Sequence, residues 1–300
     1  MHQLRSWIVV MGLGLSAVAR GDEPRAGTIR FTRKAPVVGE SAEHRSRMEM
    51  SLDFRVVIPD SEPTPVVMTS QNLDSMLLTV LATKGGVETR MRITYGDVVE
   101  MGSVGGGKQT REVSPVSQKA YEAEVKKGTI RVTQAQGKPV SSEEKAQVLK
   151  DLVGLGEEDA FVAAFPSTPL QVGDSLEAVA KVFEEQLQDS ATDEVTYQDT
   201  RIHLAEIRQD PRGPMGVLAV STLLLAPIGE EDAPLSIEMR VLGTLNILAD
   251  GTVLTDVSMG GPVKLVMTDA AREAGVEIHG KGSMRMNLTV RPVPAAPGKN

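Results

Sequence analysis

Alternation of apolar and polar residues with a period of two is the dominant pattern along this chain. One run extends from Met48 to Ile58, a second keeps one phase from Leu235 to Ile247, and a third extends from Val276 to Val290. Successive side chains of a strand point to opposite faces of its sheet. The pattern therefore predicts antiparallel strands with one apolar and one solvated face.

Turn sequences join the predicted strands in consecutive pairs. These turns are Lys84–Gly86, Asp210–Gly213 and Ala249–Thr252, the last with an Asp-Gly pair. Hairpins that follow one another build a meander. At ~3.3 Å per residue several runs exceed the usual strand length of ~17–20 Å, and strands that long require a strongly twisted sheet.

Three segments in the middle of the chain have helical spacing. Ser141 and Glu144 have the spacing of a capping box, and the apolar stripe that follows ends near Gly154. A second helix is expected from Glu157 to Phe165 and a third from Asp174. The predicted fold is thus α+β and mostly β: a long-stranded, antiparallel, curled, half-barrel-like sheet with two or three short helices from the middle of the chain.

Segments rich in proline and glycine mark the expected linkers and ends. The linkers are expected at Pro59–Asn72, Gly102–Pro115, Pro166–Asp174 and Ala226–Pro234. We expect a single β-rich domain over 20–291, with possible sub-domains 27–165 and 174–291 that share one sheet. Residues 292–300 are expected to form a disordered tail.

The N-terminus has the pattern of a cleavable secretion signal over residues 1–19. Arg5 gives a positive start, Trp7–Leu15 is apolar, and Ser16–Ala19 offers small residues for a signal peptidase. A retained N-terminal anchor is the alternative, but the apolar run is shorter than the ~20 residues that span a bilayer. We expect an exported protein, periplasmic or extracellular, that is not membrane-spanning after signal cleavage.

Composition narrows the possible functions. The chain has no cysteine, which excludes disulfides and thiol catalysis. Its formal net charge is −8, and loss of Arg5 with the signal makes it one unit more negative. Nucleic acid is therefore not an expected partner. Few aromatic residues are available to stack sugars or bases.

The glycine-rich segment Gly102–Gln109 resembles a phosphate-binding loop but lacks its chemistry. Gln109 stands where a Ser or Thr hydroxyl would bind magnesium, and a strand is expected next where a helix is required. A glycine loop without nucleotide is the favoured interpretation.

No catalytic, cofactor-binding or metal-binding residue could be assigned. His44, His203 and His279 lack the spacing of a zinc site, although assembly of the three in space stays open. Gly156–Ala160 and Gly229–Ala233 share the sequence GEEDA. Calcium binding is one hypothesis for these clustered carboxylates, but coincidence is favoured, with the first copy at the start of a helix and the second in a solvated loop. No nucleophile elbow is present. Every Asp and Glu is expected on a polar face or in a loop, which leaves no carboxylate pair for glycoside hydrolysis.

Methionine is frequent, with 14 residues in the chain. Met239, Met284 and Met286 fall on the predicted apolar faces. Methionine-rich surfaces accept varied apolar ligands, but methionine also fills gaps in cores, and the second interpretation is favoured.

The central part of the chain resembles a family of uncharacterised, exported, β-rich bacterial proteins. The residues that carry the resemblance are Tyr121, Gly128–Val132, Gly137–Ser141 and Phe165–Ser175. Ser175 stands where those proteins often have tryptophan. The resemblance implies a β-rich exported domain and no activity. The architecture is also similar to that of periplasmic lipid and lipoprotein carriers, by analogy alone.

Two functions fit this description. The first is a non-enzymatic structural or interaction protein of the cell envelope, with a packed sheet and an envelope protein as partner. The alternative is a carrier or binding protein whose sheet encloses an apolar ligand such as a lipid. A hydrolase without a recognisable motif is the least favoured, and no cofactor is expected.

Overall fold

The computed structural model describes residues 27–135, 137–190, 195–227 and 235–294. The protein is mostly β, with 61% of residues in strands and 13% in helices, which confirms the predicted fold class. The predicted signal over 1–19 and the second GEEDA copy lie outside the described residues.

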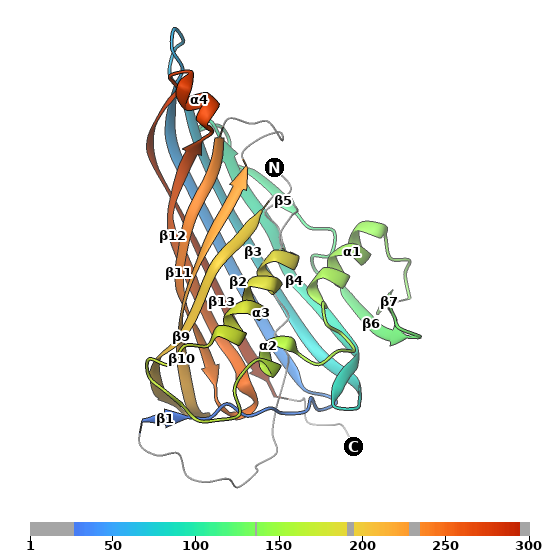
Figure 1. The fold of residues 1–300 in the computed structure, drawn as a ribbon. Helices are drawn as coiled ribbons and strands as arrows, with labels where there is room; N and C mark the ends of the chain where they lie inside the picture. The colour runs from blue at the N-terminus through green and yellow to red at the C-terminus, as the bar shows by residue number, and fades with distance from the viewer. Residues whose placement is uncertain (1–26, 136, 191–194, 228–234, 295–300) are drawn as a thin grey trace.

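Eleven strands form one antiparallel sheet that is curled but not closed (Figure 1). They are β2 Ser41–Val57, β3 Thr64–Lys84, β4 Val87–Val104, β5 Thr110–Val113, β6 Ala120–Lys126, β7 Thr129–Gln134, β9 Thr196–Asp210, β10 Gly213–Pro227, β11 Leu235–Leu248, β12 Val253–Met267 and β13 Glu277–Val293. A separate two-stranded sheet pairs β1 Thr28–Ile29 with β8 Leu170–Gln171.

The sheet runs in the order β7-β6-β4-β3-β2-β13-β12-β11-β10-β9, with β5 also paired to β4. The predicted hairpins join β3 to β4, β9 to β10 and β11 to β12, so these turn predictions are confirmed. The last turn includes a 3-10 helix, η1 Asp250–Thr252. Pairing of β13 with β2 joins the C-terminal strands to the N-terminal ones in the middle of the sheet.

All three predicted helices are present. They are α1 Ser142–Asp151, α2 Ala160–Ala163 and α3 Glu177–Ser190. The capping box at α1 is complete, since Ser141 Oγ accepts from Glu144 N at 3.1 Å and Glu144 Oε2 accepts from Ser141 N at 2.7 Å. In Figure 1, α2 and α3 lie against the inside of the curl, whereas α1, β6 and β7 form a lobe at its side.

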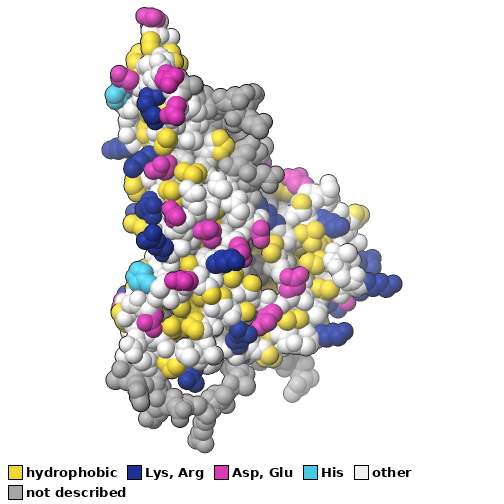
Figure 2. Space-filling model, viewed as in Figure 1, with side chains coloured by type: hydrophobic (Ala, Val, Ile, Leu, Met, Phe, Trp, Pro, Cys, Tyr) yellow, Lys and Arg dark blue, Asp and Glu magenta, His cyan; other side chains and the backbone are white. Residues whose placement is uncertain are grey.

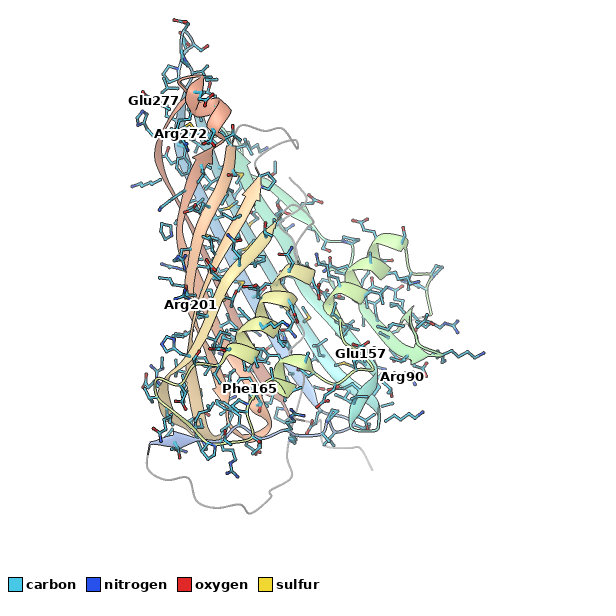
Figure 3. All side chains as sticks on the ribbon, viewed as in Figure 1. Arg90, Glu157, Phe165, Arg201, Arg272 and Glu277 are labelled. Atoms are coloured by element: carbon cyan, nitrogen blue, oxygen red, sulfur yellow. The ribbon has the colours of Figure 1, made fainter. Side chains whose placement is uncertain are left out.

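A fourth helix, α4 Asp269–Glu273, was not predicted from the sequence. It connects β12 to β13 at the narrow end of the molecule, where Arg272 lies, whereas Phe165 lies near the wide end (Figure 3). An ion pair between Arg272 and Asp269 at 2.8 Å closes its single turn. So short a helix has too few residues to show helical periodicity.

The prediction of a linker at Pro59–Asn72 is wrong over most of its length, because β3 already begins at Thr64. Pro65 pairs with Arg55 of β2 on one side. On the other side, β4 pairs with β3 only from Met68 onward. The start of β3 is therefore a local edge, where a residue without an N–H is tolerated. The segment 166–174 likewise contains β8, and 102–115 contains β5.

The C-terminal end of the sheet also differs from expectation. Pro292 and Val293 pair with Ala42 and Ser41 of β2, although the tail was expected to begin at Pro292. These two residues belong to the sheet because β2 continues far enough to pair with them.

Candidate functional site

The apolar face of the sheet lines the inside of the curl, where its side chains pack against one another. Gly282 of β13 shows how closely they approach. A methyl group at its Cβ position would lie 2.8 Å from Leu52 Cδ2 and 2.9 Å from Val263 Cβ. The space above this glycine is thus filled by neighbouring strands.

The three methionines predicted on the apolar faces are buried in this interior. Met239, Met284 and Met286 are between 2 and 8% exposed. They belong to one continuous core that also includes the inner faces of α1, α2 and α3. The prediction of their placement is confirmed, and their packing matches the use of methionine as a core filler.

Between α1 and the sheet lies a buried polar cluster that the sequence did not predict. Asp151 and Glu144 are only 4 and 7% exposed. The expectation that every acidic residue lies on a polar face or in a loop is therefore wrong for both. Their spacing was the available signal, because Glu144, Val148 and Asp151 lie at i, i+4 and i+7 on one face of a helix.

Asp151 accepts hydrogen bonds from two side chains. Tyr95 Oη donates to Asp151 Oδ2 at 2.6 Å, and Gln147 Nε2 lies 3.1 and 3.0 Å from the two carboxylate oxygens. Burial raises the pKa of Asp151 to about 6, although the hydrogen bonds from Tyr95 and Gln147 oppose that rise. Burial, together with the neighbouring Asp151, raises the pKa of Tyr95 far above its usual range.

Glu144 is held in its charged form by three neighbours. Lys119 Nζ and Tyr121 Oη donate to Glu144 Oε1 at 2.7 and 2.8 Å, and the Ser141 N–H donates to Oε2. The hydrogen bond from Lys119, followed by those from Ser141 and Tyr121, lowers the pKa of Glu144 to about 2. Helix α1 is thus fixed to β6 through one carboxylate.

A pocket of about 30 Å³ lies beside Asp151 and is lined by polar side chains of β3 and β4, including Asn72, Asp74 and Glu100. A volume of this size accommodates about one water molecule. Groups with shifted pKa values are candidates for chemistry, but this pocket is smaller than a small-molecule site.

His44 of β2 lies inside the curl and is 1% exposed. Its neighbours in the sheet are Met76 of β3 and Val290 of β13. Neither ring nitrogen has a hydrogen-bond partner among the described residues. Burial lowers the pKa of His44 to about 4, so the imidazole is neutral at pH 7.

The other two histidines among the described residues lie on the outside of the sheet, His203 in β9 and His279 in β13. His279 Nε2 lies 3.1 Å from Glu277 Oε2 at the solvent-exposed end of β13, as expected for a residue on the polar face. Within the part of the chain that the structure describes, no group of three or more His, Cys, Asp or Glu residues could hold a metal ion.

The glycine segment forms a hairpin loop rather than a strand-to-helix turn. Gly105 and Gly106 have φ angles of 65° and 70°, which carry the chain from β4 into β5. Gly102 pairs with Thr110 across this loop. The prediction that a strand follows the loop is confirmed.

The first GEEDA copy begins a helix. Asp159 Oδ1 accepts from the N–H groups of Phe161 and Val162 at 2.9 and 3.1 Å and thereby caps α2. The helix-start interpretation of this copy is confirmed.

Comparisons with known proteins identify no relative. No protein-family model and no curated protein matches this chain. Among solved structures, an outer membrane channel from Pseudomonas putida F1 aligns at 9% identity with a TM-score of 0.26, covering 91% of this chain and all of that one. DynF, from the dynemicin biosynthesis pathway of Micromonospora chersina, aligns at 8% identity with a TM-score of 0.19, covering 90% of this chain and 92% of that one. Scores this low carry no inference of fold or function.

Among the residues that the structure describes, no helix has both the length and the apolar character needed to cross a membrane.

Proposed function

We propose that this protein is an exported, non-enzymatic interaction protein of the cell envelope that binds a partner protein through its exposed edges and loops. The observation that carries the proposal is the packing of the apolar face of the sheet inside the curl. Side chains of β2, β12 and β13 pack against one another there, and α2 and α3 lie against the same face. Surfaces for a partner are therefore on the outside.

The carrier alternative needs a ligand-sized apolar cavity, and typical small-molecule pockets have volumes of ~300–1,000 Å³. A cavity of about 240 Å³ lies beside the C-terminal ends of α1 and α3. Six acidic residues line it: Glu88, Glu157, Glu158, Asp159, Glu185 and Asp189. Leu78, Met91, Leu152, Leu155 and Val182 are among the residues that line the rest of it. The acidic rim disfavours a fatty acid or an anionic lipid, and the volume lies below that of a typical small-molecule pocket, so the cavity favours the alternative only for a small neutral ligand.

Chemical cross-linking in intact cells of the native host tests the proposal. We expect a reproducible cross-linked species that contains one envelope protein beside this chain. A chain that is recovered only as a monomer, or that stays in the cytoplasm, would contradict the proposal. Organic extraction of the purified protein tests the alternative, because stoichiometric lipid in the extract would favour a carrier.

A further inference from the structure

We propose that a groove beside β7 binds an extended, acidic polypeptide segment of a partner protein, which adds as a strand to the free edge of the sheet. This inference rests on the proposed function and names the surface and the chemistry of the partner. The groove lies on the lobe formed by β6, β7 and α1, and has a volume of about 950 Å³.

Strand β7 is an edge strand with backbone groups available for pairing. It follows β6 through the two-residue turn Lys127-Gly128, and the closing pair of such a hairpin, Lys126 and Thr129, is hydrogen-bonded. Hydrogen-bonded pairs alternate along the ladder, so the N–H and C=O groups of Ile130 and Val132 point away from β6. Among the described residues, no other group forms a hydrogen bond with them.

The groove combines an apolar floor with a basic rim. Ile130, Val132 and Val140 are half-buried and pack against the core. The wall opposite β7 is the segment 137–140, which leads into α1. An added strand could therefore place alternate side chains on apolar surface while its backbone pairs with β7, the mode of binding known as strand addition.

The rim is strongly basic although the whole chain has a net charge of −8. Lys127, Arg131, Lys138 and Lys145 line the groove and are exposed. Within the part of the chain that the structure describes, Lys127, Lys138 and Lys145 form no ion pair within 4 Å. Figure 2 shows Lys and Arg side chains beside apolar ones over this lobe.

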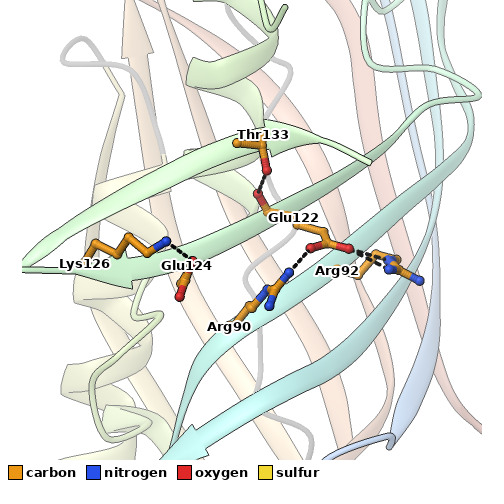
Figure 4. Close-up of polar contacts among 6 residues, drawn as sticks. All are labelled: Arg90, Arg92, Glu122, Glu124, Lys126 and Thr133. Carbon is orange, nitrogen blue, oxygen red and sulfur yellow. Dashed lines mark hydrogen bonds and ion pairs between the residues drawn. The ribbon is translucent and has the colours of Figure 1, made fainter. Parts of the chain in front are cut away.

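The acidic residues of β6 are already engaged elsewhere. Glu122 accepts from Arg90 and Arg92 of β4, and Glu124 pairs with Lys126 at 2.8 Å (Figure 4). These carboxylates therefore neutralise only part of the positive charge of the rim. A segment that carries its own carboxylates is electrostatically complementary to the remaining lysines.

Two other occupants fit less well. A second copy that paired β7 with β7 would bring the same basic side chains together, which disfavours a homodimer at this edge. An anionic lipid surface would satisfy the lysines but would leave the N–H and C=O groups of Ile130 and Val132 unpaired. An extended acidic peptide pairs its carboxylates with the lysines and its backbone with the N–H and C=O groups of Ile130 and Val132.

The test uses a fluorescein-labelled peptide of about seven residues that alternates glutamate with valine, long enough to pair with the whole of β7. Fluorescence anisotropy with the full chain should show saturable binding that weakens as salt increases. The double variant Lys138→Glu/Lys145→Glu should weaken binding at least about tenfold. The double variant Lys108→Glu/Lys264→Glu makes the same change of net charge at exposed sites outside the groove and should bind like wild type.

The backbone contribution is tested with Val132→Pro. It removes an N–H that points away from β6, so β7 keeps its own pairing while the added strand loses a hydrogen bond. We expect weaker binding with an unchanged circular dichroism spectrum. Equal binding to Val132→Pro and to wild type, or equal binding of a peptide with lysine in place of glutamate, would overturn the proposal.

The other occupants give distinct results. Binding to phosphatidylglycerol vesicles that is lost in Lys138→Glu/Lys145→Glu, without peptide binding, would assign the groove to lipid and overturn the proposal. A peptide-free dimer that Val132→Pro dissociates would assign it to a second copy, with the same consequence. If the wild-type chain binds no peptide but still forms the cross-links in the envelope, and Val132→Pro leaves those cross-links unchanged, the groove proposal fails and the proposed function stands.

Discussion

Two buried groups, His44 of β2 and Asp151 of α1, respond to pH in opposite directions. Burial lowers the pKa of His44 from 6.5 to about 4, so between these values the unfolded chain binds a proton that the folded protein does not. Stability contributed by neutral His44 is lost as pH falls through this window. Burial raises the pKa of Asp151 from 3.8 to about 6, so the folded protein keeps a proton that the unfolded chain releases. The contribution of Asp151 to the stability of the folded protein therefore increases as pH falls.

The two effects are expected to offset one another in the wild-type protein between about pH 4 and 6. The variant His44→Leu should become more stable relative to wild type as pH falls from 6.5 to 4, whereas Asp151→Asn should become less stable. Each change should amount to roughly 2–3 kcal/mol across the window. Urea unfolding at several pH values measures it. His279→Leu, at an exposed site, is the control, and a wild-type pH dependence in His44→Leu would contradict the assignment.

Glu144 affects stability at lower pH than His44 and Asp151 do. Its pKa is lowered to about 2, so the stability it contributes is present above about pH 4.5 and is lost as pH falls toward 2. Glu144→Gln keeps the size of the side chain but removes the charge that accepts from Lys119. We expect a loss of about 1–3 kcal/mol at pH 7, measured by urea unfolding, and a smaller loss at pH 3. Lys119→Met should give a similar loss at pH 7, and a full loss for Glu144→Gln at pH 3 would contradict this explanation.

At the level of the element, α1 depends on its capping box. Ser141→Ala removes the hydroxyl that accepts from Glu144 N and should destabilise the protein by about 1 kcal/mol. Ser142→Ala, one position into the helix, removes an exposed hydroxyl without a capping role and should change stability by less than about 0.5 kcal/mol. Thermal unfolding of the two variants provides the comparison. Equal effects would show that the cap does not determine the stability of this end.

At the scale of the whole molecule, the helices and the sheet share one core. Phe161 of α2 is 1% exposed, with ring centroids 5.4 Å from Phe165 and 6.3 Å from Phe183 of α3. Phe165 in turn lies 4.6 Å from Phe31. These contacts connect α2 and α3 to the segment that precedes β2.

Phe161→Ala should therefore lower the stability of the entire chain by about 3–5 kcal/mol, because it leaves a cavity between helices and sheet. Calorimetry should show one transition displaced to lower temperature. Val153→Ala, at a site that is 61% exposed, is the matched control and should have little effect. An early transition confined to the helices, with the sheet unchanged, would show that they fold separately.

The secretion signal expected from the sequence makes a prediction for the whole chain. When the full chain is expressed in a Gram-negative host, the exported protein should have the mass of a chain that begins at Arg20. Ala19→Arg places a large charged residue at the cleavage position and should leave the precursor uncut. Intact-mass spectrometry separates the two forms. Export with residues 1–19 retained in the wild-type chain would favour the N-terminal anchor instead.

Several features of this protein follow from its sequence alone. Alternation in β2, β11 and β13, the hairpin turns and the capping box of α1 each depend on the geometry of a few neighbouring residues. Local patterns of this kind are visible without a structure because side-chain direction and turn conformation are set by the adjacent backbone. The curl was also predictable, since strands of such length must twist.

Only the tertiary structure decided the rest. The start of β3 is a strand because β2 pairs with it, in spite of Pro65. Asp151 and His44 are buried because α1 and the neighbouring strands close over them. The free edge of β7 exists because the order of the sheet ends there. Strand pairing and burial depend on partners far away in sequence, and a local pattern does not identify those partners.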